Sequence, residues 1–142
     1  MKVSIIGMGY VGLSNAVLLS LKNNVVCHDI DTSKLDCINK RISPIKDSLI
    51  SNYFKNKKLR LTTSEYINKE MSKSDFIIIS TPTDFDVQKK TFNTSSIDVI
   101  LKKLNSLKST ACIIIKSTLP IGYTKKVNSF YKKLKIYFSP EF

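Results

Sequence analysis

The fold of this chain is decided by Lys2-Val-Ser-Ile-Ile-Gly7-Met-Gly9-Tyr-Val-Gly12-Leu13, which joins an apolar run to a helical pattern through three glycines. Residues 2–6 are typical of a buried parallel strand, and residues 10–22 place apolar side chains on one side of a helix. In the G-x-G-x-x-G spacing, Gly7 permits a tight turn, Gly9 lets a diphosphate approach the backbone, and Gly12 lets the helix pack closely on the strand. The helix start adds free N–H groups and the positive end of a dipole. This stretch therefore predicts a dinucleotide-binding turn.

A carboxylate follows at the distance that this motif requires. The apolar run Val25-Val-Cys-His28 ends in Asp29, which lies 17 residues after Gly12 and 22 after Gly7. An acid at the end of the second strand accepts hydrogen bonds from the hydroxyls of the adenosine ribose, and it would repel a 2′-phosphate. The sequence therefore predicts NAD rather than NADP as the cofactor. The alternative interpretation of Asp29 is a helix cap beside Asp31.

Composition narrows the class of protein. A chain of 142 residues with 42% hydrophobic content suits one domain with its own core, so we expect a single cofactor-binding domain over 1–142. No apolar stretch reaches the length of a membrane span, and the N-terminus is typical of a strand rather than a signal sequence. We therefore expect a cytoplasmic protein with no membrane partner. Because the three cysteines (Cys27, Cys37, Cys112) are isolated and His28 is the single histidine, neither a disulfide framework nor a metal site is predicted.

The net charge of +12 raises the question of a nucleic acid partner, because lysines contact phosphates without sequence preference. However, 21 of the 23 basic residues are lysine, whereas base recognition favours arginine. In addition, no basic run is interleaved with aromatic residues. We therefore interpret the charge as a solvated lysine surface that could attract anionic ligands such as a dinucleotide, and we expect no nucleic acid partner. The alternative, a lysine-driven nucleic acid binder, predicts salt-sensitive retention of DNA or RNA.

Apolar runs and helical patterns alternate along the rest of the chain. The predicted strands are 2–6, 25–28, 59–63, 75–80, 111–115 and 136–139, and the predicted helices are 10–22, 31–40, 48–57, 64–71, 95–107 and 123–134. Asp31 and Asp47 are typical helix caps, Ser95 with Asp98 resembles a capping box, and residues 87–94 are expected to form a flexible connection. This alternation predicts an α/β fold of Rossmann type, a doubly wound six-stranded parallel sheet with strand order 3-2-1-4-5-6.

Two more polar residues are candidates for the ligand crevice of such a sheet. Lys34 follows the ribose acid closely and could reach the adenosine end of a cofactor, although a solvated helix lysine is an equally good interpretation. Thr83 lies in the loop Thr81-Pro-Thr-Asp84 at the carboxyl end of the fourth strand, where its hydroxyl could contact the cofactor. The same loop residues are also ordinary turn formers. Spacing alone leaves both alternatives open.

Four motifs, in this order, resemble those of the UDP-glucose/GDP-mannose dehydrogenase family over the whole chain. They are Gly7-Met-Gly-Tyr-Val-Gly-Leu-Ser14, Ser80-Thr-Pro-Thr-Asp-Phe-Asp86, Lys116-Ser-Thr-Leu-Pro-Ile-Gly-Tyr-Thr124 and Ser139-Pro-Glu-Phe142. The second motif is more similar to that of the UDP-glucose enzymes than to that of the GDP-mannose branch. The resemblance implies an NAD-dependent oxidoreductase that converts the C6 alcohol of UDP-glucose to the carboxylate of UDP-glucuronate. It also implies that the reaction uses two NAD and a cysteine that carries thiohemiacetal and thioester intermediates.

The resemblance implies cofactor-binding roles for individual residues. It assigns the adenosine half of NAD to Asp29 and Lys34. The three glycines of the turn, together with Tyr10 and Val11, would bind the diphosphate. Thr83 is placed in the cofactor cleft.

The resemblance also implies roles for residues near the reacting atoms. Thr118 would line the cofactor cleft and position a water near the reacting C6. Glu141 would act as a base in thioester hydrolysis, and Glu141 and Phe142 would begin to hold the sugar nucleotide. From the residues alone, the alternatives are a helix-capping role for Thr118 and a solvent-facing Glu141.

A complete enzyme of this family is implied to be longer than this chain. The catalytic lysine and asparagine, the nucleophilic cysteine and the long helix that forms most dimer contacts would all lie beyond residue 142. The three cysteines of this chain do not match the nucleophile. We therefore expect this chain to bind NAD without turning over UDP-glucose, and the full-length enzyme to be a homodimer. A non-catalytic NAD-binding module used for sensing or regulation is the alternative.

Overall fold

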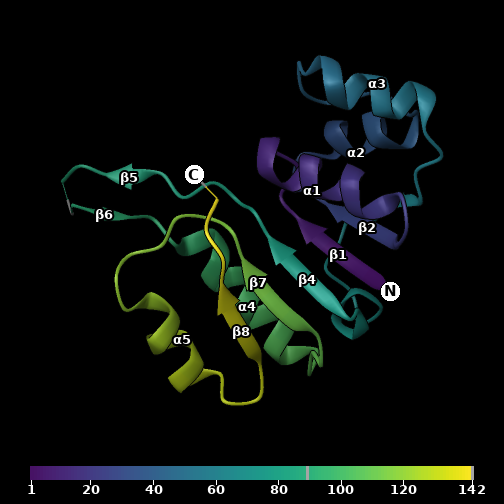
Figure 1. Ribbon diagram of the computed structural model, residues 1–142. Coiled ribbons are helices and arrows are strands. Elements are labelled where there is room, and N and C mark those ends of the chain that lie inside the picture. Colours follow the sequence, from purple (N-terminus) through teal and green to yellow (C-terminus); the bar gives the residue numbers. More distant parts are fainter. Residues whose placement is uncertain (89, 142) are drawn as a thin grey trace.

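The computed structural model describes residues 1–88 and 90–141, and it shows a parallel sheet with helices on both faces (Figure 1). The strands of this sheet are β1 (Lys2–Ile6), β2 (Asn24–His28), β3 (Leu61–Thr63), β4 (Phe76–Ile79), β7 (Cys112–Ile115) and β8 (Lys135–Phe138). Neighbouring strands pair in parallel in the order β3-β2-β1-β4-β7-β8. The predicted Rossmann-type sheet and its strand order are therefore confirmed.

Helices connect the strands and divide between the two faces of the sheet. They are α1 (Tyr10–Ser20), α2 (Thr32–Asn39), α3 (Ser48–Asn56), α4 (Ser95–Ser106) and α5 (Tyr123–Phe130). The Asp31 and Asp47 side chains accept hydrogen bonds from the backbone N–H groups of Ser33 and Ile50, so both predicted helix caps are confirmed. Helices α1 to α3 lie together beside β1 and β2, whereas α4 and α5 flank the half that contains β7 and β8 (Figure 1). No helix in the described ranges is both long enough and apolar enough to cross a membrane.

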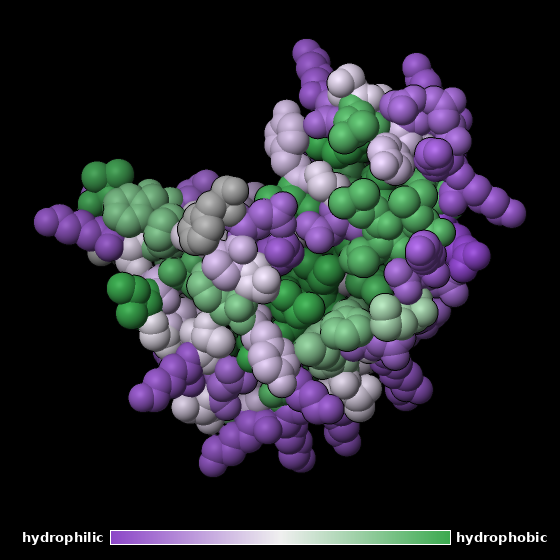
Figure 2. All heavy atoms as spheres, in the orientation of Figure 1, coloured by the Kyte–Doolittle hydropathy of each residue, from purple (hydrophilic) through white to green (hydrophobic). Residues whose placement is uncertain are grey.

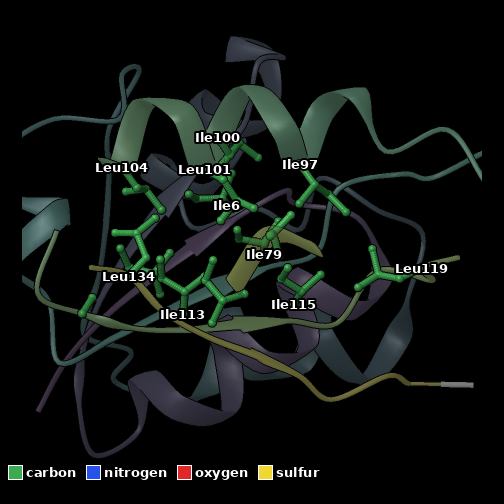
Figure 3. Packing of buried hydrophobic residues seen from close by; sticks show 14 of the residues in the cluster. Ile6, Ile79, Ile97, Ile100, Leu101, Leu104, Ile113, Ile115, Leu119 and Leu134 are labelled. Carbon is green, nitrogen blue, oxygen red and sulfur yellow. The ribbon is translucent and has the colours of Figure 1, made fainter. Parts of the chain in front are cut away.

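The sheet separates two hydrophobic clusters. In β1, Ile6 belongs to the cluster under α4 and Ile5 to the cluster under α1, because successive side chains of a strand point to opposite faces. Figure 3 shows the α4 side chains Ile97, Leu101 and Leu104 packed toward strand side chains. Because an apolar cluster packs against each face of the sheet, the ends of the strands are held in place. The first residues of the loops that follow these strands are therefore held in place too.

Part of the sheet is not covered on the side of α1. Figure 2 shows apolar side chains gathered across the middle of the molecule, where Figure 1 shows β4 and β7 facing the viewer, while hydrophilic side chains project around the rim. Phe76 and Ile114 are only partly buried there, although both pack against the cluster under α1. The second half of the sheet is therefore less covered on this face than on the face of α4 and α5.

The predicted helix over 64–71 is wrong. Only a short 3₁₀ turn, η1 (Met71–Lys73), forms at the end of this segment. The Ser64 hydroxyl donates to the Tyr66 carbonyl oxygen at 2.7 Å, and the Asn68 side chain accepts from the Met71 N–H at 2.9 Å. Such local bonds between side chains and backbone compete with helical hydrogen bonds, which the apolar pattern alone did not reveal.

The segment before α4 also differs from prediction. Instead of a simple connection, β5 (Phe85–Asp86) and β6 (Thr91–Phe92) form a small antiparallel hairpin that extends away from the sheet (Figure 1). The rings of Phe85 and Phe92 pack edge to face with centroids 5.2 Å apart, which supports this pairing. The predicted capping box of Ser95 with Asp98 is wrong, because Thr94 is the residue before the helix and makes no side-chain cap; its hydroxyl donates instead to the Asp98 side chain at 3.2 Å. At the other end of the chain, α5 stops at Phe130 rather than at residue 134.

Candidate cofactor site

A cleft of about 890 Å³ opens at the carboxyl ends of the strands. The connections after β1 and β4 leave toward opposite faces of the sheet, and a crevice forms where such neighbouring loops diverge. Among the residues predicted as site residues, those that line the cleft are Gly7, Gly9, Tyr10, Val11, Asp29, Lys34, Thr83, Thr118 and Glu141. Gly12 is not part of the lining, and Phe142 lies outside the described residues. The fold therefore gathers residues from five separate segments, those after β1, β2, β4, β7 and β8, around one cavity.

The glycine turn forms one wall of the cleft. Gly7 has a φ of 97°, a left-handed conformation that glycine adopts without strain. A Cβ atom on Gly12 would lie 1.8 Å from the Gly7 carbonyl oxygen, so the helix start approaches the turn too closely for a side chain. A Cβ atom on Gly9, in contrast, would meet no protein atom within 4 Å. The protein's own packing requires glycine at positions 7 and 12, whereas the space at Gly9 is open to a ligand.

The Asp29 carboxylate is fixed to the glycine turn. Its Oδ2 atom accepts a hydrogen bond of 2.6 Å from the Met8 N–H, and its Oδ1 atom accepts one of 2.9 Å from the Asp31 N–H. The residue is only 8% exposed, although it lines the cleft. The Lys34 Nζ atom lies 3.4 Å from Oδ2. Because a carboxylate can accept about four hydrogen bonds, these three donors leave capacity for a ligand hydroxyl.

The alternative interpretation of Asp29 as a helix cap is not supported. The cap of α2 is Asp31, whose Oδ1 atom accepts from the Ser33 N–H at 3.0 Å and from the Ser33 hydroxyl at 2.6 Å. The hydroxyl hydrogen bond is the main reason that the pKa of Asp31 lies below its usual range. Asp29 is thus free of a capping role, and the helix that follows it places Lys34 beside its carboxylate.

Thr83 and Thr118 approach the cleft from neighbouring loops. The loop after β4 is joined to the loop after β7 by the Ser117 hydroxyl, which donates to the Thr81 carbonyl oxygen at 2.6 Å. The alternative capping role for Thr118 is wrong, because α5 begins after Gly122 and has no side-chain cap. The Thr118 side chain is therefore available to the cleft.

Glu141 lies at the end of the cleft that is formed by the loops after β7 and β8. Its Oε2 atom is 3.2 Å from the Lys116 Nζ atom, and its side chain is 45% exposed. Lys116 also donates to the Ser139 carbonyl oxygen at 3.3 Å, and the Asn15 amide of α1 lies 3.5 Å from the same Glu141 oxygen. Sequence reasoning missed Lys116, although it opens the third motif. Glu141, with which Lys116 forms its ion pair, is 25 residues further along the chain, and the pairing of β7 with β8 brings these two residues together.

Apolar residues form a further part of the lining that the sequence did not reveal. Ile30 is 96% exposed and follows Asp29 directly, and Val99 on α4 is 69% exposed. Exposed apolar side chains beside a few fixed polar groups are typical of small-molecule sites. Little in the sequence indicates this apolar lining. Ile30 is a single apolar residue between two acids, and Val99 belongs to a helix whose other apolar residues pack in the core.

The cysteines lie away from this cavity. Cys27 is buried in β2, and burial raises the pKa of its thiol to about 12, so the side chain stays protonated at neutral pH. Neither it nor Cys37 or Cys112 is among the lining residues. Within residues 1–88 and 90–141, no group of three or more His, Cys, Asp or Glu side chains is arranged to hold a metal ion. The cavity thus offers backbone N–H groups for a phosphate, carboxylates that accept hydrogen bonds, and the hydroxyls of Thr81, Thr83 and Thr118.

Comparisons with known proteins agree with this geometry. The family model for the NAD-binding domain of the UDP-glucose/GDP-mannose dehydrogenases matches residues 1–142. The UDP-glucose 6-dehydrogenase of Campylobacter jejuni is 45% identical to the whole chain, which spans 37% of that protein. The corresponding protein of Streptococcus pneumoniae is 43% identical, and the chain spans 36% of it. The chain thus has about a third of the length of these curated relatives.

Solved structures show the same fold. The whole chain superposes on a GDP-mannose dehydrogenase from Pseudomonas aeruginosa with a TM-score of 0.84 at 21% identity, and it covers 36% of that protein. A UDP-glucose dehydrogenase from Pyrobaculum islandicum gives a TM-score of 0.83 at 19% identity. The resemblance seen in the four motifs is therefore confirmed over the full sequence. The chain belongs to the UDP-glucose/GDP-mannose dehydrogenase family, of which it contains the NAD-binding domain, and NAD is the cofactor of this domain.

Proposed function

We propose that this chain is the cofactor-binding part of an NAD-dependent dehydrogenase that oxidises the C6 alcohol of UDP-glucose. The observation that carries the proposal is the fixed position of Asp29 against the glycine turn, with an open space at Gly9. A dinucleotide needs an acceptor for its ribose hydroxyls and a side-chain-free approach to backbone N–H groups, and this arrangement supplies both.

The adenosine half of NAD would lie at the Asp29 end of the cleft. The Asp29 carboxylate accepts hydrogen bonds from ribose hydroxyls, and Lys34 holds this carboxylate from the solvent side. Ile30 and Val99 offer apolar surface for a flat base. A 2′-phosphate would bring a second negative charge close to Asp29, and this repulsion favours NAD over NADP.

The diphosphate would lie over the glycine turn. The backbone N–H groups at the start of α1, together with Tyr10 and Val11, line the cavity beside Gly9. Bound NAD would supply the hydride acceptor for the oxidation.

The reacting end would lie near Thr118, Glu141 and the Thr83 loop. A threonine hydroxyl can hold a water by hydrogen bonding, and a carboxylate can remove a proton from it. Glu141 lines the cavity beside Lys116, and this position suits the role of a general base in the hydrolysis of an acyl intermediate. The position of Phe142 is outside the described residues, so its proposed substrate contact stays a prediction.

This chain should not complete the oxidation without further catalytic groups. The proposed reaction uses a cysteine as nucleophile, and none of the three cysteines lines the cleft. Incubation of the chain with UDP-glucose and NAD should therefore give no sustained formation of NADH. Continued turnover would contradict this part of the proposal and would require a nucleophile other than these thiols.

Calorimetric titration with NAD and NADP tests the cofactor assignment. We expect NAD to bind at least about tenfold more tightly than NADP, and Asp29→Ala to weaken NAD binding by a similar factor. Asp47→Ala is a matched control, because Asp47 caps α3 and does not line the cleft. That variant should lose about 1 kcal/mol of stability but keep its NAD affinity. Equal binding of both dinucleotides, or an Asp29→Ala variant that binds NAD like the unchanged chain, would overturn the assignment.

A further inference from the structure

Ser80 is a partly buried residue whose hydroxyl oxygen is itself buried and has no hydrogen-bond partner among the described residues. The residue follows β4 directly and contributes to the lining of the cleft, yet its Oγ atom exposes less than 1 Å². Other serines near the sheet are satisfied: the hydroxyls of Ser4 and Ser74 share a hydrogen bond of 2.8 Å. An unpaired buried hydroxyl destabilises a protein, so its presence beside a ligand cleft needs a physical explanation.

The backbone holds Ser80 directly against the glycine turn. Its N–H donates to the Ile6 carbonyl oxygen at 2.8 Å, which continues the pairing of β4 with β1. A Cβ atom on Gly7 would lie 2.6 Å from the Ser80 carbonyl oxygen, and one on Gly12 would lie 3.4 Å from the Ser80 Cβ atom. Ser80 therefore packs its carbonyl group close to Gly7 and its Cβ atom close to Gly12.

This position places an unused donor behind the turn at which a phosphate would be held. A serine hydroxyl has three staggered positions about its Cα–Cβ bond, and it can also act through one ordered water. Backbone N–H groups at a helix start rarely satisfy every oxygen of a diphosphate, so an added hydroxyl donor would find an acceptor there. Without a ligand, this donor has no hydrogen-bond partner among the described residues.

We propose that the Ser80 hydroxyl is a diphosphate-binding group, which hydrogen-bonds the cofactor directly or through one water when NAD is bound. This inference rests on the proposed NAD site and adds a residue from β4 to it. It also predicts effects of opposite sign on the free and the bound protein, because the hydroxyl is unsatisfied without cofactor and satisfied with it. A purely structural serine would lower stability in both states when its hydroxyl is removed.

The test is the variant Ser80→Ala, studied by thermal unfolding without cofactor and by calorimetric titration with NAD. The expected result is a melting temperature equal to or above that of the unchanged chain, together with NAD binding about three- to tenfold weaker. ADP should show the same loss, whereas adenosine, which carries no phosphate, should show none. Ser4→Ala is the control, because the Ser4 hydroxyl is also buried but has a hydrogen-bond partner, and this variant should lower the melting temperature without changing NAD affinity.

The outcomes separate the two proposals. If the unchanged chain does not bind NAD, the proposed function fails and this inference fails with it. If the unchanged chain binds NAD and Ser80→Ala binds it equally well, only the role of Ser80 is overturned. A lower melting temperature of Ser80→Ala without cofactor would show that the hydroxyl has a partner inside the protein, and this result would also overturn the inference.

Discussion

Substitution of single glycines in the turn separates folding from ligand binding. Gly9 has φ −83° and ψ −165°, an extended conformation that alanine also adopts, and its Cβ would meet no protein atom within 4 Å. Gly9→Ala should therefore leave the unfolding free energy unchanged or raise it by about 0.5 kcal/mol, because alanine restricts the unfolded chain. The new methyl group occupies the space that a diphosphate needs, so NAD affinity should fall at least about tenfold.

Gly12→Ala is expected to do the reverse. Its Cβ would lie 1.8 Å from the Gly7 carbonyl oxygen, so the helix start must move by more than about 1 Å from the turn. Such overpacking costs about 3 kcal/mol, and the better helix propensity of alanine offsets about 1 kcal/mol of it. We expect a net loss of about 2 kcal/mol.

The assay is chemical unfolding of both variants without cofactor, followed by calorimetry with NAD. A Gly9→Ala variant that binds NAD normally would refute the placement of the diphosphate. A Gly12→Ala variant as stable as the unchanged chain would refute the packing argument.

Three further predictions concern the body of the domain. Tyr123→Phe removes the hydroxyl that donates to the Asp98 carboxylate at 2.7 Å and joins α5 to α4. The variant should therefore lose about 1–2 kcal/mol of unfolding free energy, measured by urea titration. An unchanged urea midpoint would show that this hydrogen bond does not stabilise the domain. Burial raises the pKa of Cys27 to about 12. Between pH 9 and 12 this thiol ionises only in the unfolded chain, so the unfolding free energy should fall as the pH rises through this range. Below pH 9 the thiol should not affect the unfolding free energy. Iodoacetamide at pH 8 should label Cys37 and spare Cys27 until the protein unfolds, and early labelling of Cys27 would contradict its burial.

The sheet was predictable from sequence because its central strands, β1 and β4, bury side chains on both faces. Parallel strands of this kind are short apolar runs such as Phe76–Ile79, and the helices between them fix their order through right-handed crossovers. Asp29 was predictable for a related reason. The motif spacing places it at the end of the strand next to β1, and the register pairs Ile6 with His28, so the next residue must lie beside the glycine turn.

The errors come from interactions that apolar periodicity does not record. The segment 64–71 has the composition of a helix, but Ser64 and Asn68 use their side chains to bond the backbone and stop helix formation. The hairpin of β5 and β6 has only two residues in each strand, and its stability depends on the contact between Phe85 and Phe92. Such a short pairing gives no detectable alternation in sequence.

Site residues that depend on distant partners were also missed. Lys116 meets Glu141 only because β7 and β8 are neighbours in the sheet. The unsatisfied hydroxyl of Ser80 is a property of packing, and nothing in the residues 75–80 distinguishes it from an ordinary strand-end serine. Sequence patterns thus identify the groups that a motif positions, whereas groups positioned by the sheet itself require coordinates.

The two ends of the cleft differ in how firmly their carboxylates are held. Asp29 is 8% exposed and accepts two backbone hydrogen bonds, one from Met8 in the glycine turn and one from Asp31 in its own loop, so its position is determined before any ligand binds. Glu141 is 45% exposed at the side chain and depends on one lysine and a long contact to Asn15. Exposed ion pairs of this kind fix a side chain only weakly. Cofactor binding can therefore be a property of this domain alone, whereas the reaction proposed at Glu141 would need further contacts to hold that carboxylate against a substrate.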